Sequence, residues 1–276
     1  MEKLLLALIA TVLATLLYFD ISSSLETERN DVRIEVRDPR ATPQSLSVAV
    51  LSDIHLSEGR APLAKFYALL EEVKASAPDL IAYVGDFTAN PRQIDDMASH
   101  RANIAEALRS VDPMPRAVVL GNYESWSDRV TPVTWVTFLE NNGVTVLQNE
   151  IEILETRKGP VCVRGLGDWY TKKWRYTRFP SECDSLPKIT LTHDPAGAFD
   201  ERVKGLVISG HTHCGQIRLP LIGAPWVPTD APRAAACGLY KDDQRAVFTS
   251  SGIGSSIIPI RLGTQSNWDV IDAVFN

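Results

Sequence analysis

Short apolar segments alternate with amphipathic ones along most of the chain. Apolar residues recurring every three or four positions predict helices at 61–76, 93–110 and 133–141. Short runs of β-branched and other apolar residues predict strands, and the first of these, whose apolar and charged residues alternate, is expected at a sheet edge. The predicted strands are 32–36, 46–51, 80–84, 117–120, 144–147, 151–154, 161–165, 188–192, 206–209, 215–218, 245–249 and 268–274. Strand–helix alternation followed by many strands predicts two packed sheets flanked by helices.

The N-terminal apolar run, residues 4–19, has a different character, because it is nearly long enough to cross a bilayer. Two interpretations stay open. An uncleaved anchor is favoured over a signal peptide because the Ser22-Ser23-Ser24 stretch is a poor cleavage site, and a buried soluble helix is disfavoured. Lys3 precedes the run, and basic residues prefer the cytoplasm, so the rest of the chain is expected outside. We therefore divide the chain into an anchor or signal segment (1–21), a stalk with an edge strand (22–44) and one folded domain (45–276).

Composition narrows the possible functions. The chain has 276 residues, 45% of them hydrophobic, which suits a folded domain with a sizeable core. Its 28 basic and 34 acidic side chains give a net charge of −6, which argues against bulk binding of nucleic acid. Its four cysteines lack the close-pair spacing of a zinc ribbon, so disulfides and free buried thiols both remain open. They are Cys162, Cys183, Cys214 and Cys237.

Potential metal ligands follow directly after five of the predicted strands. Beyond the carboxyl ends of strands in an open α/β sheet is where ligands bind, so these side chains are expected to converge on one rim. Four of the five histidines lie in these clusters, and only His100 lies elsewhere. Any single one could be a hydrogen-bonding histidine or a turn aspartate, but the set together predicts a metal site. The clusters are Asp53 with His55, Gly85-Asp86, Gly121-Asn122, His193-Asp194, and Gly210 with His211 and His213.

In their order and spacing, these motifs resemble those of the calcineurin-like metallophosphoesterases over about residues 45–275. The longer sequence GHTHCGQIRLP at 210–220, with Gly252-Ile253-Gly254 and Ile260-Arg261 after it, is similar to the membrane-associated or exported branch. Some members of that branch, and other members of the superfamily, cleave the pyrophosphate of UDP-diacylglucosamine in lipid A synthesis. Others have phosphodiesterase activity of uncertain substrate. The resemblance implies an α/β fold, a four-layer α-β-β-α sandwich of two mixed sheets, with 45–276 as the metallophosphoesterase domain.

The resemblance also implies an enzyme, a metal-dependent hydrolase of phosphoric esters or pyrophosphates with two divalent ions. Mixed imidazole, carboxylate and amide ligands suit Mn, Fe, Zn or Co, of which Mn is our first expectation. Two such ions neutralise charge on a phosphoryl group and acidify a bridging water, whose hydroxide attacks in line. One ion would be held by Asp53, His55, Asp86 and His213, and the second by Asp86, Asn122, His193 and His211.

One residue departs from the family pattern. The family usually has a histidine after Gly-Asn, where it stabilises charge and protonates the leaving oxygen; this chain has Tyr123. Asn122 and Tyr123 are the expected catalytic residues. A neutral phenol is a poor acid at pH 7, so the change favours good leaving groups such as pyrophosphates or aryl esters. The alternative is a metal-binding but catalytically weakened sensor or scaffold. His100 could substitute as the acid, although a solvated histidine on helix 93–110 is the preferred interpretation.

Two loops bear on the substrate. Segment 168–178, DWYTKKWRYTR, interleaves basic and aromatic residues that could hold phosphate or lie at a bilayer, or form a solvated loop. Segment 219–227, LPLIGAPWV, is either packed over the core or a membrane-dipping edge of the site. Together with the N-terminal run, these loops favour a phosphorylated small molecule or lipid as substrate. We expect a single-pass cell-membrane protein with its catalytic domain on the extracytoplasmic side, and no nucleic-acid partner.

Overall fold

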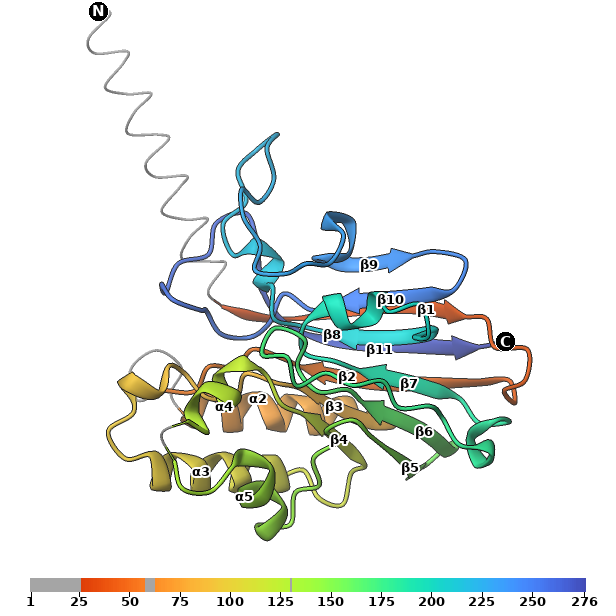
Figure 1. Ribbon diagram of the computed structural model, residues 1–276, viewed down its shortest axis with the longest axis horizontal. Coiled ribbons are helices and arrows are strands. Elements are labelled where there is room, and N and C mark those ends of the chain that lie inside the picture. Colours follow the sequence, from red (N-terminus) through yellow and green to blue (C-terminus); the bar gives the residue numbers. More distant parts are fainter. Residues whose placement is uncertain (1–25, 58–62, 130) are drawn as a thin grey trace, which may run out of the picture.

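Two mixed β-sheets form the centre of the protein (Figure 1). The computed structural model describes residues 26–57, 63–129 and 131–276. The first sheet has five strands in the order β1-β11-β2-β3-β4, and the second has six in the order β5-β6-β7-β8-β10-β9. The strands are β1 (Thr27–Val36), β2 (Gln44–Leu51), β3 (Leu80–Val84), β4 (Arg116–Val119), β5 (Glu150–Thr156), β6 (Gly159–Gly165), β7 (Lys188–Leu191), β8 (Gly205–Ser209), β9 (Gly238–Lys241), β10 (Arg245–Thr249) and β11 (Ser266–Phe275).

The parallel strands of each sheet set the position of the site. In the first sheet β2, β3 and β4 run parallel, and in the second β6, β7, β8 and β10 do. Each group therefore presents its carboxyl ends at one edge. The short connections that follow these ends carry the polar motifs, as the apolar runs predicted.

Three apolar clusters separate the layers. Val48, Val84 and Val119 of the first sheet pack against Val163 and Ile208 of the second to form the central core. The other face of the first sheet is covered by helices, which Figure 1 shows beside β2–β4. The helices are α2 (Leu63–Ser76), α3 (Met97–Arg109), α4 (Asn122–Ser127) and α5 (Trp135–Asn141).

The fourth predicted layer differs from the expectation. The outer face of the second sheet packs against the short 3-10 helix η3 (Pro195–Phe199) and against Trp174 and Tyr176 of an irregular segment. Within the described residues, no α-helix covers this face. The two mixed sheets and one helical layer are as predicted, whereas the prediction of a second α-helical layer is wrong. A loop suffices there because its aromatic rings bury the sheet without a regular backbone.

Most predicted elements are present, and the exceptions have physical reasons. Segment 144–147 is not a strand: its apolar side chains are buried, but Val144 N donates to Leu139 O at the end of α5, and the bond from Leu147 N to Val118 O of β4 is not continued into a ladder. Segment 215–218 is not one either, because Gly215 and Gln216 have φ of 83° and 55°, and Ile217 forms only an isolated bridge. The short β9 and α4 were not predicted, because their sequences, GLYK and NYESWS, contain no apolar run.

The N-terminal part of the chain joins the first sheet. β1 pairs in parallel with β11 along its whole length, from Thr27 opposite Ser266 to Val36 opposite Phe275. The strand that we predicted together with a stalk is thus an edge strand of the domain. The predicted anchor or signal segment, residues 1–21, lies outside the described residues. Among residues 26–57, 63–129 and 131–276, no helix is both long and apolar enough to cross a membrane.

Candidate metal centre

The seven predicted ligands converge from the ends of five strands. Asp53 and His55 follow β2, Asp86 follows β3, and Asn122 follows β4 in the first sheet. From the second sheet, His193 follows β7, and the turn after β8 carries the last two, His211 and His213. All seven side chains are buried. Two groups could each hold a metal ion, with ligand atoms within 4.8 Å of one another: Asp53 with His55 and His213, and Asp86 with His193 and His211.

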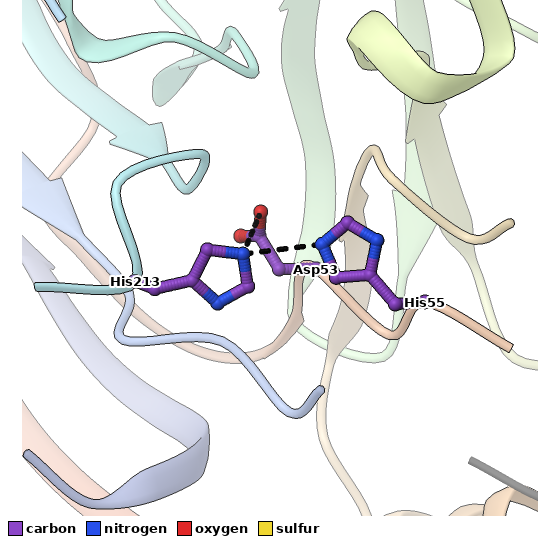
Figure 2. A group of neighbouring side chains, drawn as sticks. All are labelled: Asp53, His55 and His213. Atoms are coloured by element: carbon purple, nitrogen blue, oxygen red, sulfur yellow. Dashed lines mark hydrogen bonds and ion pairs between the residues drawn. The ribbon is translucent and has the colours of Figure 1, made fainter. Parts of the chain in front are cut away.

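Figure 2 shows the first group, whose three side chains point toward one another from two different sheets. The Nε2 atoms of His55 and His213 are 3.1 Å apart, and His213 Nε2 is 3.4 Å from Asp53 Oδ1. The other ring nitrogen of His55 lies 3.3 Å from the carbonyl oxygen of Thr88. A backbone carbonyl in that place orients the imidazole so that its Nε2 faces the other two side chains of the group.

The second group adjoins the first through Asp86. Asp86 Oδ2 is 3.2 Å from His193 Nε2, and it is also 3.9 Å from His55 Nε2 of the first group. His193 Nδ1 lies 2.7 Å from Val84 O, which again leaves Nε2 directed at the site. Asp86 therefore occupies the position between the groups that a bridging carboxylate requires.

The backbone at the ligands is strained. Asp53, His55, Asp86, His211 and His213 all have positive φ, between 49° and 68°. Residues other than glycine seldom adopt this left-handed region, and such strain persists only where the surroundings enforce it. Sharp turns at the strand ends thus aim successive side chains into one small volume.

Glycines make room for the carboxylates. A Cβ atom on Gly121 would overlap the carboxylate of Asp86, and one on Gly210 would overlap Ser52 and the carboxylate of Asp53. The glycines of the Gly-Asn and Gly-His motifs are therefore required by the close approach of the ligands.

The electrostatics favour metal-binding protonation states at four of the predicted ligands, whereas at His193 burial is outweighed by the neighbouring Asp86, which raises the pKa of that imidazole well above its usual value. Burial by itself would raise the pKa values of Asp53 and Asp86, but neighbouring imidazoles, chiefly His213 and His193 respectively, hold both below their ordinary range. Burial lowers the pKa of His55, and lowers that of His213 well below its usual value. Ionised carboxylates and neutral imidazoles are the forms that bind a metal ion.

Glu124 is a positioning residue that our sequence analysis missed. Its buried carboxylate accepts hydrogen bonds from the backbone N–H groups of Asp86 and Gly121, both at 2.9 Å, and of Thr88 at 3.1 Å. Glu124 therefore ties the turn after β3 to the turn after β4. A signal was present, because a glutamate three residues after a helix N-cap commonly bonds back to the cap N–H.

Tyr123 lies beside the two groups. Its backbone N–H donates to Asp86 Oδ1 at 2.9 Å, and its ring meets the His55 ring edge-on, with centroids 4.6 Å apart. The phenolic oxygen is 2.9 Å from Ser256 Oγ. Burial raises the pKa of Tyr123, so the group stays protonated near neutral pH. The phenol can therefore donate a hydrogen bond at the site.

A cavity of about 400 Å³ opens beside the two groups. Asp86, Asn122 and His211 form part of its floor. Aromatic and aliphatic side chains make up much of the remaining wall, among them Tyr123, Trp126, Tyr170, Trp226, Ile257 and Ile258. Such a cavity suits a ligand that combines an anionic group with an apolar part.

Segment 168–178 and His100 were both considered for roles at the site. In segment 168–178, Tyr170 lines the cavity, with its ring 4.9 Å from that of His211, whereas Arg178 lines a separate hollow. The basic side chains of this segment are thus not gathered at the site. The expectation of a solvated His100 is wrong: it is half-buried, its Nε2 lies 2.9 Å from Thr88 Oγ1, and burial lowers its pKa to about 4.

Arg261 explains the Gly-Ile-Gly and Ile-Arg motifs. Its guanidinium is fully buried and donates to the carbonyl oxygens of Ser251 at 2.8 Å and Gly252 at 2.9 Å, and to that of Gly254. It also lies 3.2 Å from His213 Nδ1. One side chain thus fixes the 251–254 loop against the turn that carries His213.

We expect Arg261→Lys to lower the free energy of unfolding by at least about 2 kcal/mol, because one ammonium group cannot satisfy all these buried carbonyls. Urea unfolding measures the change, and hydrogen exchange should show lost protection in the 251–254 loop. Arg164→Lys is the matched control, since Arg164 is equally buried but bonds Thr190 Oγ1 and Thr177 O instead of the 251–254 loop. Unchanged protection of the loop in Arg261→Lys would contradict this role.

All four cysteines are paired. Cys162 is bonded to Cys183, and Cys214 to Cys237, with Cα–Cα distances of 5.8 and 4.7 Å. These pairings decide between the two possibilities that the spacing left open. Persistent disulfides are typical of proteins that function in an oxidising environment.

Residues 46–215 match the family model for calcineurin-like phosphoesterases. An uncharacterised metallophosphoesterase of Bacillus subtilis, YkoQ, is 27% identical over 271 residues, which cover 96% of this chain and 97% of that protein. The phosphodiesterase YaeI of Escherichia coli is 26% identical over 230 residues, 82% of each chain. A Danio rerio protein named as a transmembrane protein with a metallophosphoesterase domain is 27% identical over 280 residues, 95% of this chain and 60% of its own length.

Proposed function

Because the chain belongs to the calcineurin-like phosphoesterase family, a family of metal-dependent phosphoric ester hydrolases, we propose that it cleaves a phosphodiester or pyrophosphate with two divalent ions. The observation that carries this proposal is the pair of adjoining ligand groups with Asp86 between them. We assign Asp53, His55, Asp86 and His213 to one ion, and Asp86, Asn122, His193 and His211 to the other.

The residues fit this assignment. Within the described part of the chain, the buried Asn122 Oδ1 has no hydrogen-bond partner, and the buried His193 Nε2 faces the carboxylate oxygen Asp86 Oδ2 at 3.2 Å. A buried polar atom without a partner is costly in a folded protein, and a metal ion would remove that cost. The mixture of imidazole, carboxylate and amide ligands suits Mn, Fe, Zn or Co, and we propose Mn.

The side chains around the ions would orient the substrate. Divalent ions, when bound, neutralise phosphoryl charge and activate water at neutral pH. Asn122 and Asp86 lie on the floor of the cavity, where the phosphoryl group would be held. Glu124 holds together the turn that carries Asp86 and the turn that carries Asn122. The phenol of Tyr123 lines the same cavity. Charge stabilisation by groups fixed before the reaction is the largest expected contribution to rate.

Tyr123 favours substrates with good leaving groups. The phenol remains protonated and donates a hydrogen bond, but it releases its proton less readily than an imidazolium would. A phosphate leaving from a pyrophosphate, or an aryl oxide, needs little protonation, whereas an alkoxide needs much. We therefore propose activated diesters or pyrophosphates as substrates.

Several observations support a lipid as the esterified group and the membrane as the location. The cavity joins metal-ligand residues to an apolar wall that includes Trp226 and Ile257. The sequence carries the apolar run 4–19, and the two disulfides suit the extracytoplasmic side of a membrane. One relative is named a transmembrane protein. We propose a single-pass membrane protein whose catalytic domain faces outward.

Metal removal tests the proposal. The purified full-length chain should contain about two transition-metal ions and hydrolyse an aryl phosphodiester, lose activity after chelation, and regain it with Mn²⁺. Metal analysis and rates on an aryl diester, a pyrophosphate and a phospholipid are the measurements. A protein that retains its metal but hydrolyses none of the three would favour the sensor or scaffold alternative, which Tyr123 keeps open.

A further inference from the structure

Six large apolar side chains stand exposed on two loops, 221–226 and 257–260, that contribute three of them to the wall of the cavity, and we call the six the apolar rim. Leu221 is fully exposed, and Ile257, Ile222 and Trp226 are 72%, 68% and 62% exposed. Ile258 and Ile260 complete the set, at 42% and 38%. Segment 219–227 was predicted to be either packed over the core or an edge of the site, and these exposures exclude packing over the core for its tip.

The apolar rim is one built surface. Its two loops are hydrogen-bonded to each other, since Arg218 N donates to Leu262 O at 2.7 Å and Leu262 N donates to Gln216 O at 3.0 Å. The first loop is closed by a turn in which Leu219 and Gly223 exchange two backbone bonds of 2.9 Å. The exposed side chains therefore stand on ordered turns.

The tips of both loops hold apolar residues under strain. Leu221 and Ile257 have φ of 67° and 57°, a conformation that glycine adopts freely and that is an outlier for a β-branched or bulky residue. Burial within the protein does not offset this strain, because both side chains face outward. Burial of these side chains in an apolar environment outside the protein would offset the strain.

The apolar rim is continuous with the cavity. Trp226, Ile257 and Ile258 belong to both, and the cavity floor is formed by Asp86 and Asn122. An apolar group that enters past the rim thus arrives beside the proposed metal ligands. A molecule with its phosphate at the ions would extend its apolar part along the rim.

We propose that the apolar rim inserts into the surface of a lipid bilayer, so that the active site opens at the level of the lipid headgroups. The inference deepens the proposed function and rests on it for the identity of the substrate, an amphiphile taken up from the membrane. Amphipathic helices that lie in a membrane interface bury their apolar face to a depth of about 5–10 Å, and the apolar rim would insert its side chains to a similar depth.

The point at which the chain enters the domain supports a lipid bilayer as the partner of the apolar rim. Glu26 O accepts a hydrogen bond of 2.6 Å from Gln265 Nε2, and Thr27 Oγ1 lies 2.9 Å from Ser266 Oγ. Residues 265 and 266 follow shortly after Ile260, so the chain enters the domain close to the second rim loop. In Figure 1, β1 begins on the side of the molecule where the blue loops of the rim project. The apolar run 4–19 thus precedes the domain by only a few residues.

Basic side chains beside the apolar rim are complementary in charge to anionic lipids. Arg218 and Arg233 line the hollow beside Ile222. Basic residues beside an inserted apolar surface are attracted to anionic lipid headgroups.

Tryptophan fluorescence tests the proposal in the full-length chain. The six tryptophans all lie at position 126 or beyond, so the apolar run 4–19 contributes no signal. We reconstitute the chain in phosphatidylcholine–phosphatidylglycerol vesicles with and without brominated acyl chains, which quench only immersed indoles. Quenching is expected in the wild type and is expected to be lost in Trp226→Phe, which keeps an apolar side chain but removes the reporter.

The double variant Leu221→Asp/Ile222→Asp keeps Trp226 and should lose the quenching. Ile153→Asp is the matched control, because Ile153 is an exposed isoleucine on β5, the edge strand of the second sheet separated from β8 by β6 and β7, and the quenching of this variant should equal that of the wild type. An unquenched wild type, or quenching that persists in Trp226→Phe or in the double variant, overturns the proposal. A rim buried between two copies of the chain would give a dimer in ultracentrifugation without quenching, and would overturn it too.

Hydrolysis of an aryl phosphodiester by the wild type is measured in the same vesicles. This rate reports on the proposed function, and the quenching reports on the rim. A quenched but inactive protein would therefore refute the hydrolase mechanism and leave the membrane surface supported.

Discussion

Replacing Asp86 with alanine should lower turnover by more than about 10³-fold and reduce the metal content from about two ions per chain to one or fewer. The reason is the position of this carboxylate, with Oδ2 3.2 Å from His193 Nε2 in one group and 3.9 Å from His55 Nε2 in the other. Both proposed ions share it. Asp86→Asn, which keeps the shape but removes the charge, should lose metal as well. Metal analysis and rates on an aryl phosphodiester are the measurements.

The same strand supplies a matched control for this variant. Asp79 directly precedes β3 and Asp86 follows it shortly, and both carboxylates are buried. Asp79 accepts a hydrogen bond from Ser47 N at 2.9 Å and pairs with Arg157 and Lys158, away from the ligands. Asp79→Ala should cost about 1–3 kcal/mol of stability and leave the metal content unchanged. Two ions and full activity in Asp86→Ala would refute the shared carboxylate.

Tyr123→His should raise hydrolysis of an alkyl phosphodiester by about 10²-fold while changing that of an aryl diester little. General acid catalysis is typically worth about 10²–10⁴-fold, and an alkoxide leaving group needs the proton that a phenol releases poorly. The ring of Tyr123 lies beside His55 and its side chain lines the cavity, so an imidazole in its place would face the reacting group. The measurement is a plot of log rate against leaving-group pKa.

Two further variants separate the ring from the hydroxyl. Tyr123→Phe removes the phenolic oxygen, and Ser256→Ala removes its partner at 2.9 Å without changing the ring. If the hydroxyl donates to the substrate, Tyr123→Phe should slow the reaction more than Ser256→Ala does. Parallel plots for wild type, Tyr123→His and Tyr123→Phe at equal metal content would show that residue 123 has no part in proton delivery.

The convergence of the predicted ligand motifs could be predicted from the sequence because it does not depend on the order of the strands in the sheet. Each of Asp53, Asp86, Asn122, His193 and His211 comes within a few residues of the end of a short apolar run. The carboxyl ends of parallel strands share an edge, so the side chains meet whichever strands are neighbours. Their roles as metal ligands remain predictions that metal analysis tests.

Features that depend on long-range contacts could not be predicted. Apolar content indicates burial but not pairing, and for this reason segment 144–147 was taken for a strand. His213, which Arg261 contacts, is 48 positions away along the chain, and the pairing of Cys162 with Cys183 depends on how β6 and the following loop pack. Composition alone also could not decide whether segment 219–227 is buried or exposed, because its exposure depends on whether other parts of the chain pack over it.

The disulfide between Cys214 and Cys237 has a consequence for the maturation of the protein. Cys214 directly follows His213, so the bond restrains the turn that carries a proposed metal ligand. Thermodynamic coupling is reciprocal: a disulfide that favours metal binding is itself stabilised against reduction once the metal is bound. Thiol oxidation and metal loading would then promote one another, and a chain that is still reduced would hold its ions more weakly. Newly made protein would thus gain its full metal content only as its cysteines are oxidised.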